Sequence, residues 1–134
     1  DNAGRYRQQN VLISGATTMP PDYTLLNDKM AHLVDWYNSA AHTFHPIERA
    51  AKVLADFVGI HPFIDGNGRT SRLLMNLELM KAGYPPCVIT VENRLAYYEA
   101  LDQWMAYGIT EPFIQLVTDA VLEGFKPYQV VLGI

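Results

Sequence analysis

The sequence lacks several features that would place it in a specialised class of protein. It has one cysteine, Cys87, so no disulfide can form within the chain. Because Cys87 lies in an apolar stretch, we expect it to be a small buried residue. No apolar run reaches the length of a membrane span, and the chain does not open with the apolar segment of a secretory signal. The net charge of −4 provides no broad basic field, which argues against nucleic acid or an anionic membrane as a partner.

The composition is that of one compact domain with its own core. The chain has 134 residues, of which 49% are hydrophobic, and this is enough to bury a core without metals or disulfides. It begins at Asp1 without an initiator methionine. We therefore expect residues 1–134 to be a single core excised from a longer chain.

Apolar spacing predicts an all-α fold with one small β-hairpin. Val11 to Ser14 are β-prone, Gly15 favours a turn, and Pro20 ends the return arm, so the hairpin is expected within residues 9–20. Five helices are expected at about 22–37, 46–58, 67–82, 92–107 and 112–123. Asp22 and His45 are expected to cap the first two helices. The expected inward residues of the third helix are Leu73, Leu74, Leu77 and Met80.

The densest chemistry lies in residues 61–72, directly before an apolar helical run. The glycines on either side of Asn67 permit positive φ and let backbone N–H groups approach a ligand closely. At the start of a helix, unpaired N–H groups and the positive end of the helix dipole favour an anion. Arg69 and Arg72 are three residues apart, so both can project from one face toward that anion, and guanidinium groups suit phosphate oxygens.

Asp65 and His61 complete a set of residues suited to transfer of a phosphorus-containing group. A carboxylate beside phosphates is explained by Mg²⁺, which is commonly held by one or two carboxylates together with phosphate oxygens. His61 has the ordinary pKa of a base that accepts a proton at neutral pH. Each feature alone has a structural explanation, namely a turn, a buried histidine or a solvated helix face. Their ordered coincidence within one segment favours the functional interpretation.

Residues 61–72 resemble the signature of Fic-domain proteins, His-x-Phe-x-(Asp/Glu)-Gly-Asn-Gly-Arg-x-x-Arg, with every fixed position present. The resemblance is strongest to the branch that includes the animal and bacterial AMP-transferases. It extends along nearly the whole chain, at Gly4–Arg7, Val11–Ile13, His45–Glu48, Leu73–Asn76, Ala82–Pro86 and Tyr97–Tyr98. The resemblance implies a Fic-type helical bundle in which residues 1–134 form the catalytic core.

The resemblance also implies a reaction, protein AMP transfer, and a role for each motif residue. His61 would take the proton from a Ser, Thr or Tyr hydroxyl of a target protein, whose oxygen attacks the α-phosphorus of ATP and releases pyrophosphate. Asp65 would hold Mg²⁺ between the α- and β-phosphates. The implied phosphate-binding residues are Gly66, Asn67, Gly68, Arg69 and Arg72, with Arg69 at the β-phosphate and Arg72 at the γ-phosphate.

Two further sites follow from the same resemblance. The hairpin at 9–20 looks like the family's flap, where Val11, Leu12 and Ile13 would dock a target segment as an added strand. Tyr98 and Leu101 match the adenine side of the nucleotide pocket. Met105 stands where close relatives commonly have asparagine, and a thioether can pack on a purine but cannot donate a hydrogen bond to it.

Three alternatives to AMP transfer remain open from the sequence. The same pocket could remove AMP from a modified protein, it could act as a nucleotide-gated binding module without turnover, or it could transfer another group such as phosphocholine, UMP or phosphate. Retention of His61 argues against a module that only senses nucleotide, because a sensor has no use for a base.

An inhibitory helix of the form (Ser/Thr)-x-x-x-Glu-(Gly/Asn), known in many Fic proteins, has no match in this chain. Glu123-Gly124 follows Asp119 rather than Ser or Thr, and Glu92-Asn93 follows Val88. We expect such a helix to come from a missing N-terminal segment or a separate protein, or to be absent, and the core itself to be unrestrained. The default expectation for the compartment is the bacterial cytoplasm.

Overall fold

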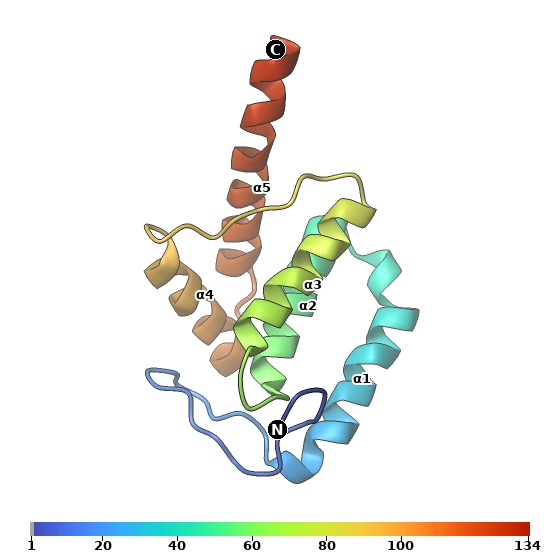
Figure 1. Cartoon of the computed structure of the whole chain (residues 1–134), viewed down its shortest axis with the longest axis vertical. Coiled ribbons are helices and arrows are strands. Elements are labelled where there is room, and N and C mark those ends of the chain that lie inside the picture. Colours follow the sequence, from blue (N-terminus) through green and yellow to red (C-terminus); the bar gives the residue numbers. More distant parts are fainter. Residues whose placement is uncertain (1) are drawn as a thin grey trace.

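A computed structural model describes residues 2–134, which form five α-helices and two short 3₁₀ helices. The pair α2 (Pro46–Ile60) and α3 (Asn67–Lys81) lies at the centre, with α1 (Leu26–Ser39) on one side and α4 (Arg94–Tyr107) on the other (Figure 1). The last helix, α5 (Glu111–Leu132), packs on α2 and α4 and then projects beyond them. The all-α prediction is confirmed. None of these helices combines the length and apolarity needed to cross a membrane.

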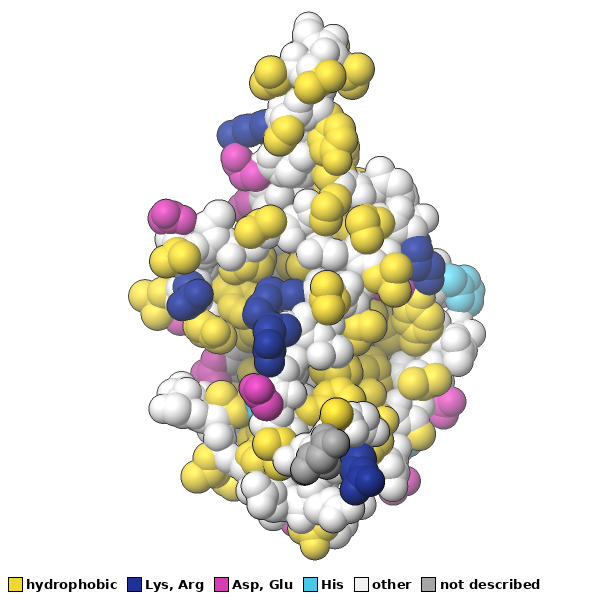
Figure 2. Space-filling view, in the orientation of Figure 1, with side chains coloured by type: hydrophobic (Ala, Val, Ile, Leu, Met, Phe, Trp, Pro, Cys, Tyr) yellow, Lys and Arg dark blue, Asp and Glu magenta, His cyan; other side chains and the backbone are white. Residues whose placement is uncertain are grey.

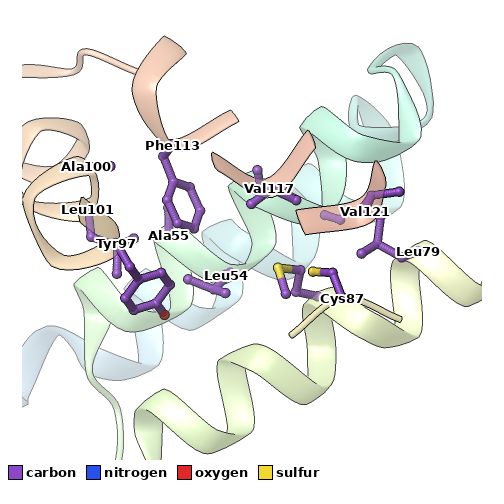
Figure 3. Close-up of a cluster of buried hydrophobic side chains, with 13 residues drawn as sticks. Leu54, Ala55, Leu79, Cys87, Tyr97, Ala100, Leu101, Phe113, Val117 and Val121 are labelled. Atoms are coloured by element: carbon purple, nitrogen blue, oxygen red, sulfur yellow. The ribbon is translucent and has the colours of Figure 1, made fainter. Parts of the chain in front are cut away.

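The core is built where α5 crosses α2, α3 and α4 (Figure 3). Phe113 of α5 is completely buried, and its ring lies 5.8 Å from the ring of Tyr97 and 6.0 Å from that of Trp104. Cys87 is buried in the same cluster, and burial raises the pKa of its thiol to about 11. The thiol is therefore an apolar packing group, as the sequence predicted.

Both predicted helix caps are present. The His45 imidazole accepts a hydrogen bond from the Ile47 N–H at 3.2 Å, and Pro46 occupies the first position of α2. The Asp22 carboxylate accepts a hydrogen bond from the Thr24 N–H at 2.9 Å and so caps the 3₁₀ helix η1 (Tyr23–Leu25), which leads into α1. The second short helix, η2 (Ala41–Thr43), links α1 to α2. These caps fix where the two helices begin.

The predicted inward face of α3 is wrong at most positions. Among the predicted inward residues, the ones that are exposed are Leu73, Leu77 and Met80. The buried ones on this helix are Asn67, Ser71, Met75, Glu78 and Leu79. Glu78 is buried because its carboxylate accepts hydrogen bonds from the Tyr37 hydroxyl and from Arg49 Nε, the latter at 3.1 Å. Apolar periodicity cannot reveal a carboxylate whose burial depends on partners from two other helices.

The predicted β-hairpin flap is also wrong, because residues 9–20 contain no strand. Ala16 N–H donates to Ile13 O at 3.2 Å, which closes a turn, but the loop's two arms are not paired. The tip is instead attached to α4, where the Asp102 carboxylate accepts the Thr17 N–H. Pro20, on the return arm, has no N–H to donate to a strand ladder. The segment is an open loop beneath α4 (Figure 1).

The last helix is longer than predicted. It was expected to end at about Glu123 but continues to Leu132, with Pro127 inside it. At Gly124 the helix passes very close to another segment, since a Cβ there would lie 3.1 Å from the Pro86 carbonyl oxygen. Gly124 therefore marks a close crossing rather than a helix end.

Replacing Phe113 with alanine should destabilise the fold strongly. The change empties the centre of the core and removes two edge-to-face ring contacts, which costs about 3–5 kcal/mol in the free energy of unfolding. Urea denaturation followed by circular dichroism measures this loss. The matched control is Val130→Ala on the same helix, because Val130 is 81% exposed and its loss should change stability by less than about 0.5 kcal/mol. Equal stability of the two variants would contradict the assignment of this core.

Candidate active site

A cavity of about 470 Å³ lies between the 61–72 segment, α4 and the tip of the 9–20 loop. Figure 2 shows basic side chains gathered beside the hollow between α3 and α4. The sequence-predicted site residues that line the cavity are Ile13, His61, Asn67, Gly68, Arg72, Tyr98 and Leu101. The predicted site residues outside its wall are Val11, Leu12, Asp65, Gly66 and Arg69. The fold thus brings the predicted base, one arginine and the predicted adenine-side residues into one space.

His61 ends α2 in an uncommon backbone conformation. Its φ of 52° and ψ of 59° are left-handed, and its N–H donates to Phe57 O at 3.0 Å, which closes the last turn. Few residues other than glycine adopt this conformation, although histidine does so more readily than most. The backbone therefore turns sharply at His61, whose side chain lines the cavity.

The surroundings of His61 favour the neutral form of its imidazole. Burial lowers its pKa, and the positive charge of Arg7 lowers it further. Its Nδ1 atom is buried and has no hydrogen-bond partner within residues 2–134. A neutral imidazole in a cavity can accept a proton from a hydroxyl brought beside it.

The side chain of Asn67 closes the loop between α2 and α3. Its Oδ1 accepts the Phe63 N–H at 2.9 Å, and its Nδ2 donates to Phe63 O at 2.8 Å. The residue before it, Gly66, has a φ of 82°, which suits glycine and starts α3. Because both polar groups of the Asn67 side chain are used, an anion would be met by backbone N–H groups at the start of α3.

Arg72 forms the cationic part of the wall. Gly68 gives it room, since a Cβ at that position would lie 3.2 Å from Arg72 Nη1. Tyr97 is buried behind it, and burial raises the pKa of the Tyr97 hydroxyl while hydrogen bonding and charge from Arg72 oppose the rise. Arg72, Tyr97 and His61 thus line the same cavity.

Asp65 and Arg69 form an ion pair of 3.3 Å at the surface, next to the cavity. Their side chains are 89% and 74% exposed, so the pair is screened by water and easily exchanged for other partners. No cluster of three or more metal-ligating side chains occurs in the described part of the chain. A single carboxylate fits Mg²⁺ that is bound mainly through phosphate oxygens and water, and does not fit a metal held by protein ligands alone.

The two adjacent tyrosines of α4 face different surroundings, because consecutive side chains on a helix point in different directions. Tyr97 is 3% exposed and belongs to the core, whereas Tyr98 is 57% exposed and lines the cavity from the outside. Their rings lie 5.3 Å apart at 70°. Leu101 and Met105 follow Tyr98 on the same helix face and extend the apolar wall.

Two residues that sequence reasoning missed are central to the site. Asp102 lines the cavity and accepts hydrogen bonds from the Thr17 side chain and, at 2.7 Å, from its N–H, which lower the pKa of the carboxyl group. Its position four residues after Tyr98 was a usable signal. Arg7 is only 2% exposed and contacts the end of α2, but a charged residue in an aperiodic segment carries no local sign of burial.

Comparisons with known proteins agree on one family. Residues 1–79 match the Fic/DOC family. The chain is 47% identical over 116 residues to protein adenylyltransferase Fic of Nematostella vectensis, a match that covers 86% of this chain and 26% of that protein. It is 44% identical over 117 residues to the Aedes aegypti protein of the same name, covering 87% and 23% respectively. The chain thus spans about a quarter of the length of these curated relatives.

A solved structure shares the fold over nearly the whole chain. Fic-1 from C. elegans superposes with a TM-score of 0.85 at 37% identity. The match covers 98% of this chain and 38% of that one. The arrangement of helices around the cavity is therefore shared with that protein.

Removing the Asp102 carboxylate should release the tip of the 9–20 loop. In Asp102→Ala the Thr17 N–H and hydroxyl lose their acceptor. Amide hydrogen exchange, read by mass spectrometry, should therefore become several-fold faster in the loop tip while the helices exchange as before. Glu99→Ala is the control, since Glu99 is an exposed acidic residue on the same helix. Unchanged exchange at Thr17 in the Asp102 variant would show that this contact does not hold the loop.

Proposed function

The chain belongs to the Fic/DOC family, and we propose that residues 1–134 are the catalytic core of a protein adenylyltransferase. The enzyme moves AMP from Mg-ATP to a Ser, Thr or Tyr hydroxyl of a target protein and releases pyrophosphate. The observation that carries the proposal is one cavity shared by a histidine with a lowered pKa, an arginine and the start of a helix. This set supplies a base, a cation and an anion-binding helix terminus to the same ligand.

The proposed chemistry gives each of these groups one role in the transfer. His61 accepts the proton of the target hydroxyl as that oxygen forms a bond to the α-phosphorus of ATP. The bond from the α-phosphorus to the bridging oxygen breaks, and pyrophosphate leaves with the bonding electrons. Backbone N–H groups at the start of α3 and the Arg72 guanidinium stabilise the negative charge of the phosphates.

Asp65, Gly66 and Arg69 act at the edge of the cavity. Asp65 would hold Mg²⁺, which lowers the charge on the phosphates when bound. Arg69 is within reach of the same phosphates once its exposed pair with Asp65 is exchanged. Gly66 supplies the left-handed turn that points the N–H groups of α3 outward.

The apolar wall on α4 suits the adenine of ATP. Tyr98 offers an exposed ring face for stacking, and Leu101 is buried beside it. Met105 packs against the wall without offering a hydrogen-bond donor to the base edge. Shape and stacking, rather than base-edge hydrogen bonds, would select the nucleotide here.

The target segment would dock on the 9–20 loop. Ile13 lines the cavity while Leu12 is 76% exposed, so alternate side chains of this arm point to the site and to solvent. Ile13 O accepts the Ala16 N–H, but the arms of the loop do not pair with each other, so an extended peptide would pair with the remaining backbone groups of this arm. Val11, Leu12 and Ile13 would then form the edge to which the target adds.

Loss of the base should abolish transfer without abolishing nucleotide binding. We expect His61→Ala to lower the transfer of α-labelled AMP to protein by at least about a hundredfold. ATP affinity should be nearly unchanged, because no phosphate contact is removed. The control is His32→Ala, since His32 is exposed on α1. Label on the His61 variant equal to that on the wild type would refute the assignment of the base, and no label on the wild type from ATP would refute the proposed donor or reaction.

Introducing an amide at position 105 should raise the affinity for ATP. Met105→Asn adds a donor and an acceptor that can reach a purine edge, and one net hydrogen bond is worth about 0.5–1.5 kcal/mol, or roughly 2- to 13-fold in affinity. Calorimetric titration with a non-hydrolysable ATP analogue measures the change. Met105→Leu, which keeps the apolar wall, should leave affinity close to that of the wild type. If Met105→Asn binds the analogue no better than Met105→Leu does, the adenine ring does not lie beside residue 105.

A further inference from the structure

Arg7 is a buried cation held by carbonyl groups from both ends of one loop and from the end of α2. Its Nη1 donates to Gln9 O at 2.9 Å and its Nη2 to Pro21 O at 2.6 Å. Its Nε donates to His61 O at 2.8 Å, and Nη2 also lies 3.5 Å from Ile60 O. Gln9 and Pro21 are the residues at which the loop leaves and rejoins the body of the protein, and Arg7 is 2% exposed.

The guanidinium has no carboxylate within ion-pair distance in the described residues, which makes its burial unusual. Its compensation comes from the end of α2, because carbonyl groups at a helix C-terminus carry the negative end of the helix dipole. The more distant Asp22 carboxylate adds a weaker attraction, and burial still lowers the pKa of Arg7. A charge placed this way is satisfied only while the loop ends and the end of α2 stay together.

We propose that Arg7 is a positioning residue that ties the target-docking loop to His61. One guanidinium joins both ends of the loop to the carbonyl of the catalytic base, so the docked target and the base keep a fixed separation. This inference rests on the proposed function. The inference adds to that function the contact that holds the target hydroxyl and the His61 imidazole at a fixed separation.

The charge of Arg7 also acts on the base. It lowers the pKa of His61, in addition to the larger effect of burial. The other titratable side chains that share the cavity with His61 are Arg72 on α3 and Tyr97, Tyr98 and Asp102 on α4. The Asp102 carboxylate is engaged by Thr17, and Tyr97 is buried in its neutral form.

The two contributions can be separated by substitution. Arg7→Lys keeps a positive charge but replaces a planar fork, which spans carbonyls on three sides, by a single ammonium group. Arg7→Met removes the charge and keeps a long apolar side chain for the buried site. The matched controls are Arg5→Lys and Arg5→Met, because Arg5 is exposed and only two residues away.

The test measures three quantities on each variant: the rate of AMP transfer against pH, the affinity for a non-hydrolysable ATP analogue, and the titration of the His61 imidazole by NMR. Both Arg7 variants should transfer AMP roughly ten- to a hundredfold more slowly, with nucleotide affinity changed far less. Removing a nearby positive charge favours the protonated imidazole. The acid limb of the rate profile and the His61 titration should therefore move to higher pH in Arg7→Met and stay in place in Arg7→Lys.

Wild-type rates in both Arg7 variants would overturn the inference, as would a loss of nucleotide affinity in proportion to the rate. If Arg7→Met fails to fold, Arg7→Lys still tests the proposal. In that variant, amide exchange in residues 9–20 should accelerate while the His61 titration is unchanged. Unaltered exchange in that loop would show that Arg7 does not hold the loop to the end of α2. Exchange and imidazole titration need no turnover, so a wild type without transferase activity would refute the proposed function and leave this test intact.

Discussion

The turn between α2 and α3 is the constraint on which the rest of the site depends. Asn67 closes it by bonding both polar groups of the Phe63 backbone, and Gly66 supplies the left-handed residue from which α3 starts. The turn places the C-terminus of one helix beside the N-terminus of the next. Two ends of opposite polarity therefore meet at one cavity, and each attracts a different charge.

That polarity explains how a base and an anion site can lie so close together. The carbonyl end of α2 binds the buried cation Arg7. Burial, and to a lesser extent the charge of Arg7, lowers the pKa of His61. In the proposed function, the amide end of α3 would bind phosphates, with Arg72 on the wall of the same cavity. Burial and the charge of Arg7 favour the unprotonated imidazole, which is the form that can accept a proton from an attacking hydroxyl. In the proposed function, burial and the charge of Arg7 would thus set the basicity of His61.

Sequence reasoning succeeded where local chemistry decides the outcome. The caps at Asp22 and His45 depend on two or three consecutive residues, and they are confirmed. It failed where the outcome depends on distant partners: the buried carboxylate of Glu78, the tether of the 9–20 loop to Asp102, and the burial of Arg7 all rest on contacts between elements far apart in the chain. Within the site, only part of the motif lines the cavity, since Asp65, Gly66 and Arg69 lie outside its wall. The structure was also needed to show that the Asn67 side chain is already used by the loop.

The absence of strand pairing within residues 9–20 has a consequence for target recognition. A loop whose arms are hydrogen-bonded to each other would offer a target only its outer edge, and with a fixed register. Here the loop is fixed at its base by Arg7 and at its tip by Asp102, and its two arms are not paired with each other, so in the proposed function an added peptide would pair with one arm. A loop that is held at its ends loses less conformational entropy when a peptide docks on it. Its two arms need not be hydrogen-bonded to each other for this to hold. In the proposed function, such a loop would contact the backbone of a target more than its side chains, and the geometry at His61 would then select the hydroxyl that reacts.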